Sequence, residues 1–145
     1  MHPFPHRYAI TTTRLGHGRA LIDASPRPPI EGGPPPEFGG VASRWSPEHL
    51  LMSSIGLCLY TTFEVFAAQE KLEIINWHDS VVGVLEKTPT GLAFTSYTIE
   101  VELVVDADDR ERAATIFERA KRHCIVSNAL RTTPTATARI VSPED

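Results

Sequence analysis

The order of secondary structure that the sequence predicts is that of an α+β protein. Residues 73–87 and 91–105 form the clearest β signal and predict a long hairpin. The segment before them, residues 46–70, has an uncharged apolar middle and predicts one helix. Together with the weaker signals on either side, the predicted order is β-hairpin, loop, helix, β-hairpin, helix, strand.

Length and composition predict a single domain covering residues 1–145. A chain of 145 residues buries about 70% of the surface that its unfolded form exposes. The net charge is −4 and no basic block is present, which argues against a nucleic acid or an anionic membrane as partner. The first residues lack the pattern of a signal peptide, and we expect that no apolar run reaches spanning length. We therefore expect a cytoplasmic protein.

The N-terminal part predicts a hairpin followed by a proline-rich loop. Residues 7–14 and 19–24 have strand character, and glycines at 16 and 18 flank the turn between them. Residues 25–44 hold six of the 12 prolines, so they form neither a helix nor a central strand. This segment is either a flexible linker or an ordered surface loop. We favour the ordered loop, because one domain gives a linker nothing to connect. Its expected anchors are Ile30, Phe38 and Val41.

The predicted helix at residues 46–70 has a clear start signal. Ser46 is a good N-cap, Pro47 fits the first helical position, and Glu48 favours the positive end of the helix dipole. No charge occurs between Leu50 and Leu59, so we expect this stretch to be covered on most sides.

The middle of this helix carries the first of only two cysteines. Leu51, Ile55, Cys58 and Thr62 fall on one stripe at 100° per residue. Gly56 costs about 1 kcal/mol relative to alanine. It therefore indicates either close packing of another backbone beside Cys58 or a local irregularity of the helix.

The C-terminal half continues with a turn, a helix, a short helical turn and a strand. Residues 88–91 form the turn of the long hairpin, in which the odd-numbered positions from 93 to 105 make the covered face. Asp106 or Asp108 is expected to cap the next helix, and Ser127 a later helical turn. Residues 135–141 form the last strand. The apolar face of the second helix consists of Ala113, Ile116, Phe117 and Ala120.

The two cysteines allow two interpretations. Cys58 and Cys124 are too far apart in sequence for CxxC chemistry or a zinc ribbon, and by spacing alone two inert buried thiols are favoured. If folding brings them together, one thiolate can be oxidised to a sulfenic acid and the other can form a disulfide with it. Such a site needs a nearby cation, because apolar surroundings raise the pKa of a thiol.

Glu48 is the obvious carboxylate for such a cation. It precedes Cys58 by ten residues, about 80° off the same helical line and roughly 15 Å along the axis. An intermediary is therefore required between the two side chains, and an arginine suits that role. The histidines show no HxH or HExxH pattern and the glycines form no phosphate-binding loop, so no metal or other cofactor is expected.

Two segments resemble the OsmC/Ohr family of organic hydroperoxide reductases. SPEHLLMSSIGLCLYTTFE is similar to the family's central helix, in which the peroxidatic cysteine follows the glutamate of an N/S-P-E-x-L opening by ten residues. HCIVSNAL is similar to the H-C-P-x-S-N segment that carries the second cysteine. The order of elements also fits, so the resemblance covers nearly the whole chain, and the loop resembles a less-characterised OsmC-like branch.

The resemblance implies an OsmC-like α+β fold, with antiparallel sheets packed on a long central helix in an intertwined homodimer. It implies a metal-free peroxidase without a cofactor. Cys58 would attack an organic hydroperoxide and Cys124 would resolve the sulfenic acid as a disulfide. A dithiol, of the lipoyl type in the Ohr branch, would then be the reductant. An arginine paired with Glu48 would activate the thiolate.

The chain departs from the family pattern at two places. Ile125 stands where proline usually follows the second cysteine. The family's arginine lies in a G-G-R-x-G turn, whereas this turn reads LGHGRA; Arg19 is the favoured match and Arg44 the other candidate. The alternatives to a peroxidase are a non-catalytic dimer that binds a small hydrophobic molecule in its interface pocket, and a structural domain with buried cysteines.

Overall fold

The computed structural model describes every residue from 1 to 145 and falls into two units, Met1–Leu51 and Met52–Asp145. Each unit is described by itself. The boundary lies inside helix α1, Pro47–Gln69, which therefore contributes residues to both units. The expectation of one domain over residues 1–145 stays a prediction.

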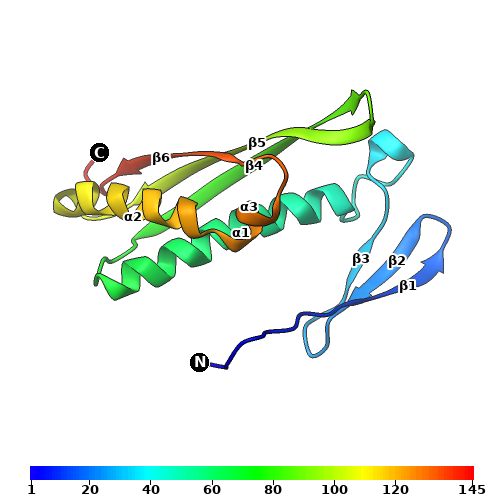
Figure 1. Cartoon of the computed structure of the whole chain (residues 1–145), viewed down its shortest axis with the longest axis horizontal. Coiled ribbons are helices and arrows are strands. Elements are labelled where there is room, and N and C mark those ends of the chain that lie inside the picture. Colours follow the sequence, from blue (N-terminus) through cyan, green and yellow to red (C-terminus); the bar gives the residue numbers. More distant parts are fainter. The chain divides into compact units, whose positions relative to one another are not determined.

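The first unit contains a three-stranded antiparallel sheet in the order β1-β2-β3 (Figure 1). Its strands are β1, Thr11–Gly16; β2, Arg19–Asp23; and β3, Ile30–Gly32. The predicted hairpin is confirmed, but its first strand begins at Thr11 and not at residue 7. The reason is that β2 ends at Asp23, the partner of Thr11, so residues 7–10 have no strand to pair with in this chain.

The proline-rich loop is ordered around the short strand β3. Gly33 N donates a hydrogen bond to the Trp45 carbonyl at 2.9 Å, which ties the start of the loop to its end. A single 3₁₀ turn, η1, Pro36–Phe38, lies between them. Two of the expected anchors are wrong, because Phe38 and Val41 are about half exposed. The backbone pairing of Gly32 with Trp45 fixes the loop in their place.

Helix α1 confirms the predicted start signal. The Ser46 hydroxyl accepts a hydrogen bond from His49 N at 3.1 Å, as an N-cap does, and the helix begins at Pro47. With 23 residues, α1 is long and apolar enough to cross a membrane by length and composition. This corrects the expectation that no apolar run reaches that length. Core helices of soluble proteins pass the same test, so the finding is weak evidence for a membrane span.

The second unit contains a three-stranded sheet in the order β4-β5-β6. The predicted hairpin and last strand are confirmed, but the expectation of antiparallel sheets is wrong for this sheet, because β6 lies parallel to β5. The connection from β5 to β6 passes through the helices, which cover one face of the sheet (Figure 1). The elements are β4, Asn76–Thr88; β5, Gly91–Val104; η2, Ala107–Asp109; α2, Arg110–His123; α3, Ile125–Ala129; and β6, Thr135–Val141.

The core of this unit lies between the sheet and the two longer helices. The predicted face of α2 is buried at all four positions. The predicted face of β5 is buried at alternate positions only from Tyr97 onward, and the expectation is wrong at Ala93 and Thr95, which are exposed. The buried stripe of α1 lies next to the predicted one, so Cys58 stands at its margin and is only half buried. The stripe consists of Ile55, Leu59, Phe63 and Ala67, which recur every four residues.

The uncharged middle of α1 is covered on most sides as expected: of the ten residues from Leu50 to Leu59, only Ser53 and Leu57 are exposed. Two other local expectations are corrected. Neither helix start after β5 is capped by an aspartate side chain: Asp106 precedes η2 without a capping bond, and Asp108 lies inside η2. Ser127 lies inside α3, whose N-cap position is taken by Cys124.

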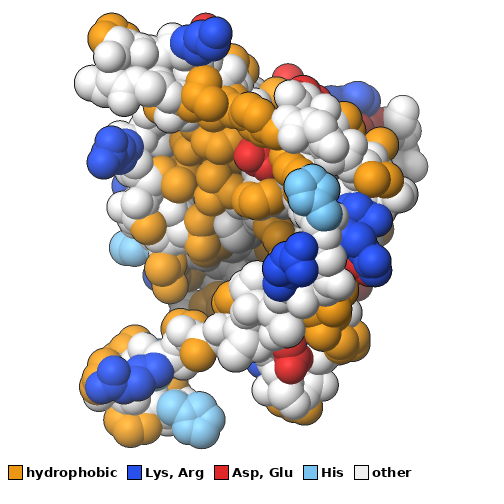
Figure 2. Space-filling view, turned by 90° about the vertical axis from the view of Figure 1, so that its right-hand side faces the viewer, with side chains coloured by type: hydrophobic (Ala, Val, Ile, Leu, Met, Phe, Trp, Pro, Cys, Tyr) orange, Lys and Arg blue, Asp and Glu red, His pale blue; other side chains and the backbone are white.

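Hydrophobic side chains are visible on the surface in Figure 2, in orange among polar ones. Large exposed ones in the second unit include Leu57 and Val65 of α1, and Val82 and Leu92 of the β4–β5 hairpin. Leu57 and Val65 lie on the exposed side of α1, which also carries the polar residues Ser53, Thr61 and Glu64.

Candidate active site

The fold brings Cys58 and Cys124 next to each other. Cys58 lies on α1, and Cys124 lies at the junction where α2 ends and α3 begins. The backbone N–H of Val126, in the first turn of α3, donates a hydrogen bond to Cys58 Sγ, with a nitrogen-to-sulfur distance of 3.5 Å. Both cysteines are free thiols. The site therefore has two sulfurs at the start of one short helix.

Cys124 is completely buried, and burial raises the pKa of its thiol above the ordinary value. Two groups of Ser127, its hydroxyl and its backbone N–H, act in the opposite direction and lower this pKa. The neighbouring Cys58 thiol raises it. Cys124 is thus a protonated thiol at neutral pH, with polar groups beside it that favour its charged form.

The first turn of α3 serves both sulfurs. The first N–H groups of a helix have no partner inside the helix, so they are free to stabilise a nearby anion. Here the N–H of Val126 reaches Cys58 and that of Ser127 lies beside Cys124. Sequence reasoning missed Val126 and assigned Ser127 to capping. The signal that could have found them is their position two and three residues after Cys124.

The two thiols differ in access. Cys58 is partly exposed, whereas the side chain of Cys124 has no contact with solvent.

Gly56 of α1 lies two residues before Cys58 and allows β4 to approach the helix closely. A Cβ on Gly56 would lie 2.7 Å from Asp79 Oδ1 of β4. The expected close packing therefore involves a side chain of β4 and not another backbone.

The other predicted site residues lie in the first unit. Arg19 Nε is 2.6 Å from Glu31 Oε1, and Arg44 Nε is 2.9 Å from the same oxygen. The hydrogen bond from Arg19 holds the pKa of the Glu31 carboxyl below its usual value, and Arg44 acts in the same direction. Glu48 makes neither contact, and its Oε2 is buried without a hydrogen-bond partner. Both candidate arginines are thus paired with Glu31, a residue that sequence reasoning did not single out.

Arg19 also lines an open cleft of about 660 Å³ in the first unit. The cleft lies between the β1–β2–β3 sheet and the start of α1, and Trp45 and Leu50 provide apolar walls. Its size is that of a site for a small organic molecule. Nowhere in the chain do three His, Cys, Asp or Glu side chains come together as a metal site would require.

The fold and the paired thiols define an OsmC-like α+β protein. The sequence model of the family described as OsmC-like protein matches residues 40–139, which include both cysteines and Glu48. The chain belongs to this family. A search of curated proteins finds no match.

Solved structures with the same fold cover almost the whole chain. An OsmC-like protein of unknown function from Vibrio cholerae is 14% identical, with a TM-score of 0.84 over 93% of this chain and 100% of that one. An organic hydroperoxide resistance protein from Elizabethkingia anophelis is 16% identical, with a TM-score of 0.74 over 96% and 99%. The protein OhrB of Bacillus subtilis, also an organic hydroperoxide resistance protein, is 19% identical, with a TM-score of 0.65 over 92% and 98%. At these identities the likeness establishes the fold.

Proposed function

We propose that this protein is a thiol-dependent peroxidase that reduces organic hydroperoxides. The observation that carries the proposal is the pairing of two free thiols at the first turn of α3, with the Val126 N–H directed at Cys58 Sγ. Membership of a family that includes organic hydroperoxide resistance proteins supports the same chemistry.

The unequal burial of the two thiols assigns their roles in this proposal. The Cys58 thiolate attacks the outer oxygen of the hydroperoxide, the O–O bond breaks, and the alkoxide takes a proton and leaves as an alcohol. Cys58 is then a sulfenic acid. Cys124 attacks its sulfur, hydroxide leaves and combines with the Cys124 proton as water, and a disulfide forms. A dithiol donates two electrons and two protons to restore both thiols.

Arg19 and Glu48 complete the proposed site. Glu48 has a buried oxygen without a partner, which a guanidinium would satisfy. Arg19 is the proposed source, with Arg44 as the other candidate, although both are bound to Glu31 in this arrangement. The proposed activation therefore requires one arginine to exchange Glu31 for Glu48.

The proposed partners follow from the surface and from the chemistry. A second copy of this chain would cover the exposed side of α1 that carries Leu57 and Val65. The reductant would be a small dithiol, such as a lipoyl group. We propose no nucleic acid partner, no membrane insertion and a cytoplasmic location, where reduced thiols are maintained.

A direct test compares the cysteine variants in a single turnover with cumene hydroperoxide. The native protein should lose the mass of two hydrogens as the disulfide forms. Cys58→Ser should consume no peroxide above background. Cys124→Ser should consume one equivalent and stop, because the sulfenic acid has no resolving thiol. Full turnover by Cys58→Ser would refute the proposal.

A second candidate is a non-catalytic dimer that binds a small hydrophobic molecule. The open cleft of about 660 Å³ beside Trp45 and Leu50 favours it. The two candidates are separated by the rate at which Cys58 is oxidised. A rate no faster than that of a free thiol would favour the binding protein.

A further inference from the structure

A pocket of about 270 Å³ lies in the second unit, beside the cysteine pair and separate from the cleft of the first unit. It is bounded by the last turns of α2, by α3 and by the start of β6. Its size is slightly below that of typical ligand pockets, so it fits a ligand of a few heavy atoms. The peroxidase chemistry proposed above does not use this pocket.

The inner end of the pocket is apolar. Its lining there consists of the buried residues Leu59, Ile99 and Ala136 and the half-buried Pro134. The Asn128 amide donates a hydrogen bond to the Arg122 carbonyl at 3.1 Å, which holds α3 against the end of α2. The pocket therefore has a preformed apolar end that suits a short hydrocarbon chain.

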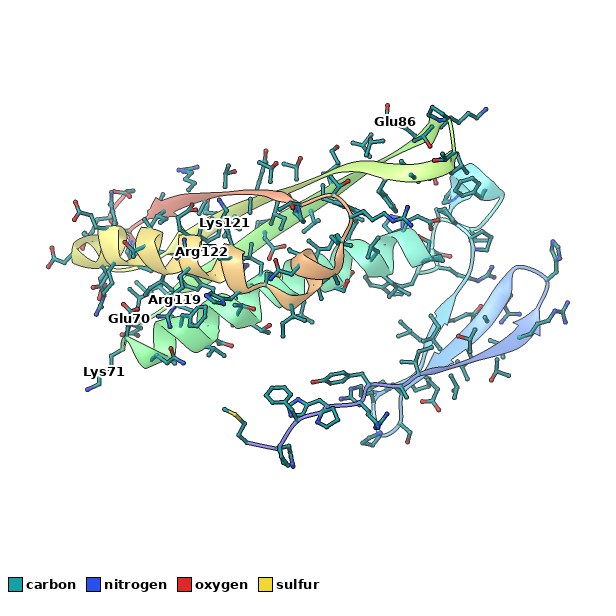
Figure 3. All side chains as sticks on the ribbon, in the orientation of Figure 1. Glu70, Lys71, Glu86, Arg119, Lys121 and Arg122 are labelled. Atoms are coloured by element: carbon teal, nitrogen blue, oxygen red, sulfur yellow. The ribbon has the colours of Figure 1, made fainter.

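The rim of the pocket is cationic. Lys121 and Arg122 line it together with one carboxylate, Glu118, so the rim carries two positive charges and one negative charge. Glu118 is bound to Lys121 at 3.2 Å, while no ion pair engages the Arg122 guanidinium. Lys121 lies on the side of α2 toward β6, and Arg119 on the opposite side, where it pairs with Glu70 (Figure 3). Of these three basic residues, only Lys121 and Arg122 face the pocket.

We propose that this pocket binds a small organic carboxylate with a short apolar chain. The chain would contact Leu59 and Ile99, and the carboxylate would be bound at the rim by Arg122 and Lys121. Ser127 of α3 also lines the pocket. Ser127 also lies beside Cys124. Ser127 would therefore stand between the bound carboxylate compound and the buried thiol.

The test uses hexanoate as the probe and follows the backbone amide signals of Ser127, Asn128 and Ala136 by NMR. We expect saturable shifts with a dissociation constant on the order of millimolar, as befits so small a ligand. Hexan-1-ol, which has the same chain without the charge, should bind about tenfold more weakly. Hexanol binding as tight as hexanoate would overturn the carboxylate assignment.

Charge variants locate the site. Arg122→Gln and Lys121→Gln should each weaken hexanoate binding, together by about tenfold or more. Lys87→Gln removes one exposed positive charge outside the pocket and should leave binding unchanged. Glu118→Gln should strengthen binding, because the rim loses its negative charge.

Native-like affinity in the Lys121/Arg122 double variant, or shifts that do not saturate, would refute the proposal. Both side chains are at the surface, so thermal unfolding can verify that the variants fold.

Discussion

At the scale of single residues, both cysteines have polar neighbours in the first turn of α3. Val126 supplies an N–H to Cys58, and Ser127 supplies a hydroxyl and an N–H beside Cys124. The two Ser127 groups favour the Cys124 thiolate without adding a charged side chain. Both arginine candidates are bound to Glu31, so neither of them takes part in these contacts in this arrangement.

Ser127→Ala should slow disulfide formation without slowing the oxidation of Cys58. The hydroxyl lowers the pKa of Cys124, so its removal raises that pKa further and reduces the thiolate fraction at neutral pH. Rapid-quench mass spectrometry with cumene hydroperoxide separates the two steps. The deficit should shrink as the pH rises toward the pKa of Cys124. Equal disulfide rates in the variant and the native protein at pH 7 would contradict this role.

The Glu31 carboxyl should titrate below the ordinary value of 4.5 for glutamate. Its pKa is lowered in the folded state, so the stabilisation from its ion pairs is present above the unfolded pKa and is lost as the pH falls through the folded one. All three side chains are partly exposed, which keeps the effect on stability small. Carboxyl carbon shifts measured by NMR report the midpoint. Arg19→Gln should move it upward, and an unchanged midpoint in that variant would argue against the pairing.

At the scale of elements, the start of α1 was predicted correctly, but the sides of this helix differ in burial. Its N-cap and first turn fix where it begins, but its neighbours decide which side is buried. On one side Ile55 and Phe63 enter the core, and on another Leu57 is exposed. Gly56 marks the closest approach of β4.

Gly56→Ala should therefore destabilise the protein. The new Cβ would lie 2.7 Å from Asp79 Oδ1, and Asp79 cannot easily move, because its other oxygen accepts a hydrogen bond from Trp77 at 2.7 Å. Overpacking costs about 1–3 kcal/mol, and the better helix propensity of alanine offsets only about 1 kcal/mol. Urea unfolding measures the difference. Gly16→Ala, with no atom within 4 Å of its Cβ, is the control and should change stability little. A more stable Gly56→Ala would show that β4 can move away.

At the scale of the whole molecule, each unit has apolar surface that its own residues do not cover. The first unit has an open cleft, and α1 presents Leu57 and Val65 to solvent. Exposed apolar surface of this kind is typical of an interface. Both features agree with the proposed homodimer.

Sedimentation should accordingly give twice the mass of one chain. Leu57→Glu would place a charge in the proposed interface and should shift the protein toward monomer, since burying an unpaired carboxylate is costly. Leu92→Glu changes an equally exposed leucine of the β4–β5 hairpin and is the matched control, expected to stay dimeric. A native protein that sediments as a monomer would refute the assembly.

The sequence by itself determined the elements whose signals are local. The face of α2, the turn between β4 and β5 and the cap at Ser46 follow from residues within one or two turns of each other. The sequence also predicted the family, because each of the two cysteine motifs is an uninterrupted run of residues. Local signals failed where a partner decides the outcome, as at the start of β1, which depends on where β2 ends.

Only the tertiary structure decided the environment of the reactive groups. Cys58 and Cys124 are 66 positions apart in sequence, and their contact arises because α1 and the α2–α3 junction pack in the same unit. The pairing of Arg19 and Arg44 with Glu31 likewise joins different elements of the first unit. Hydrogen bonds and burial between distant segments have no periodicity along the chain, so the pattern of residues predicts the helices and strands but not which polar groups they bring together.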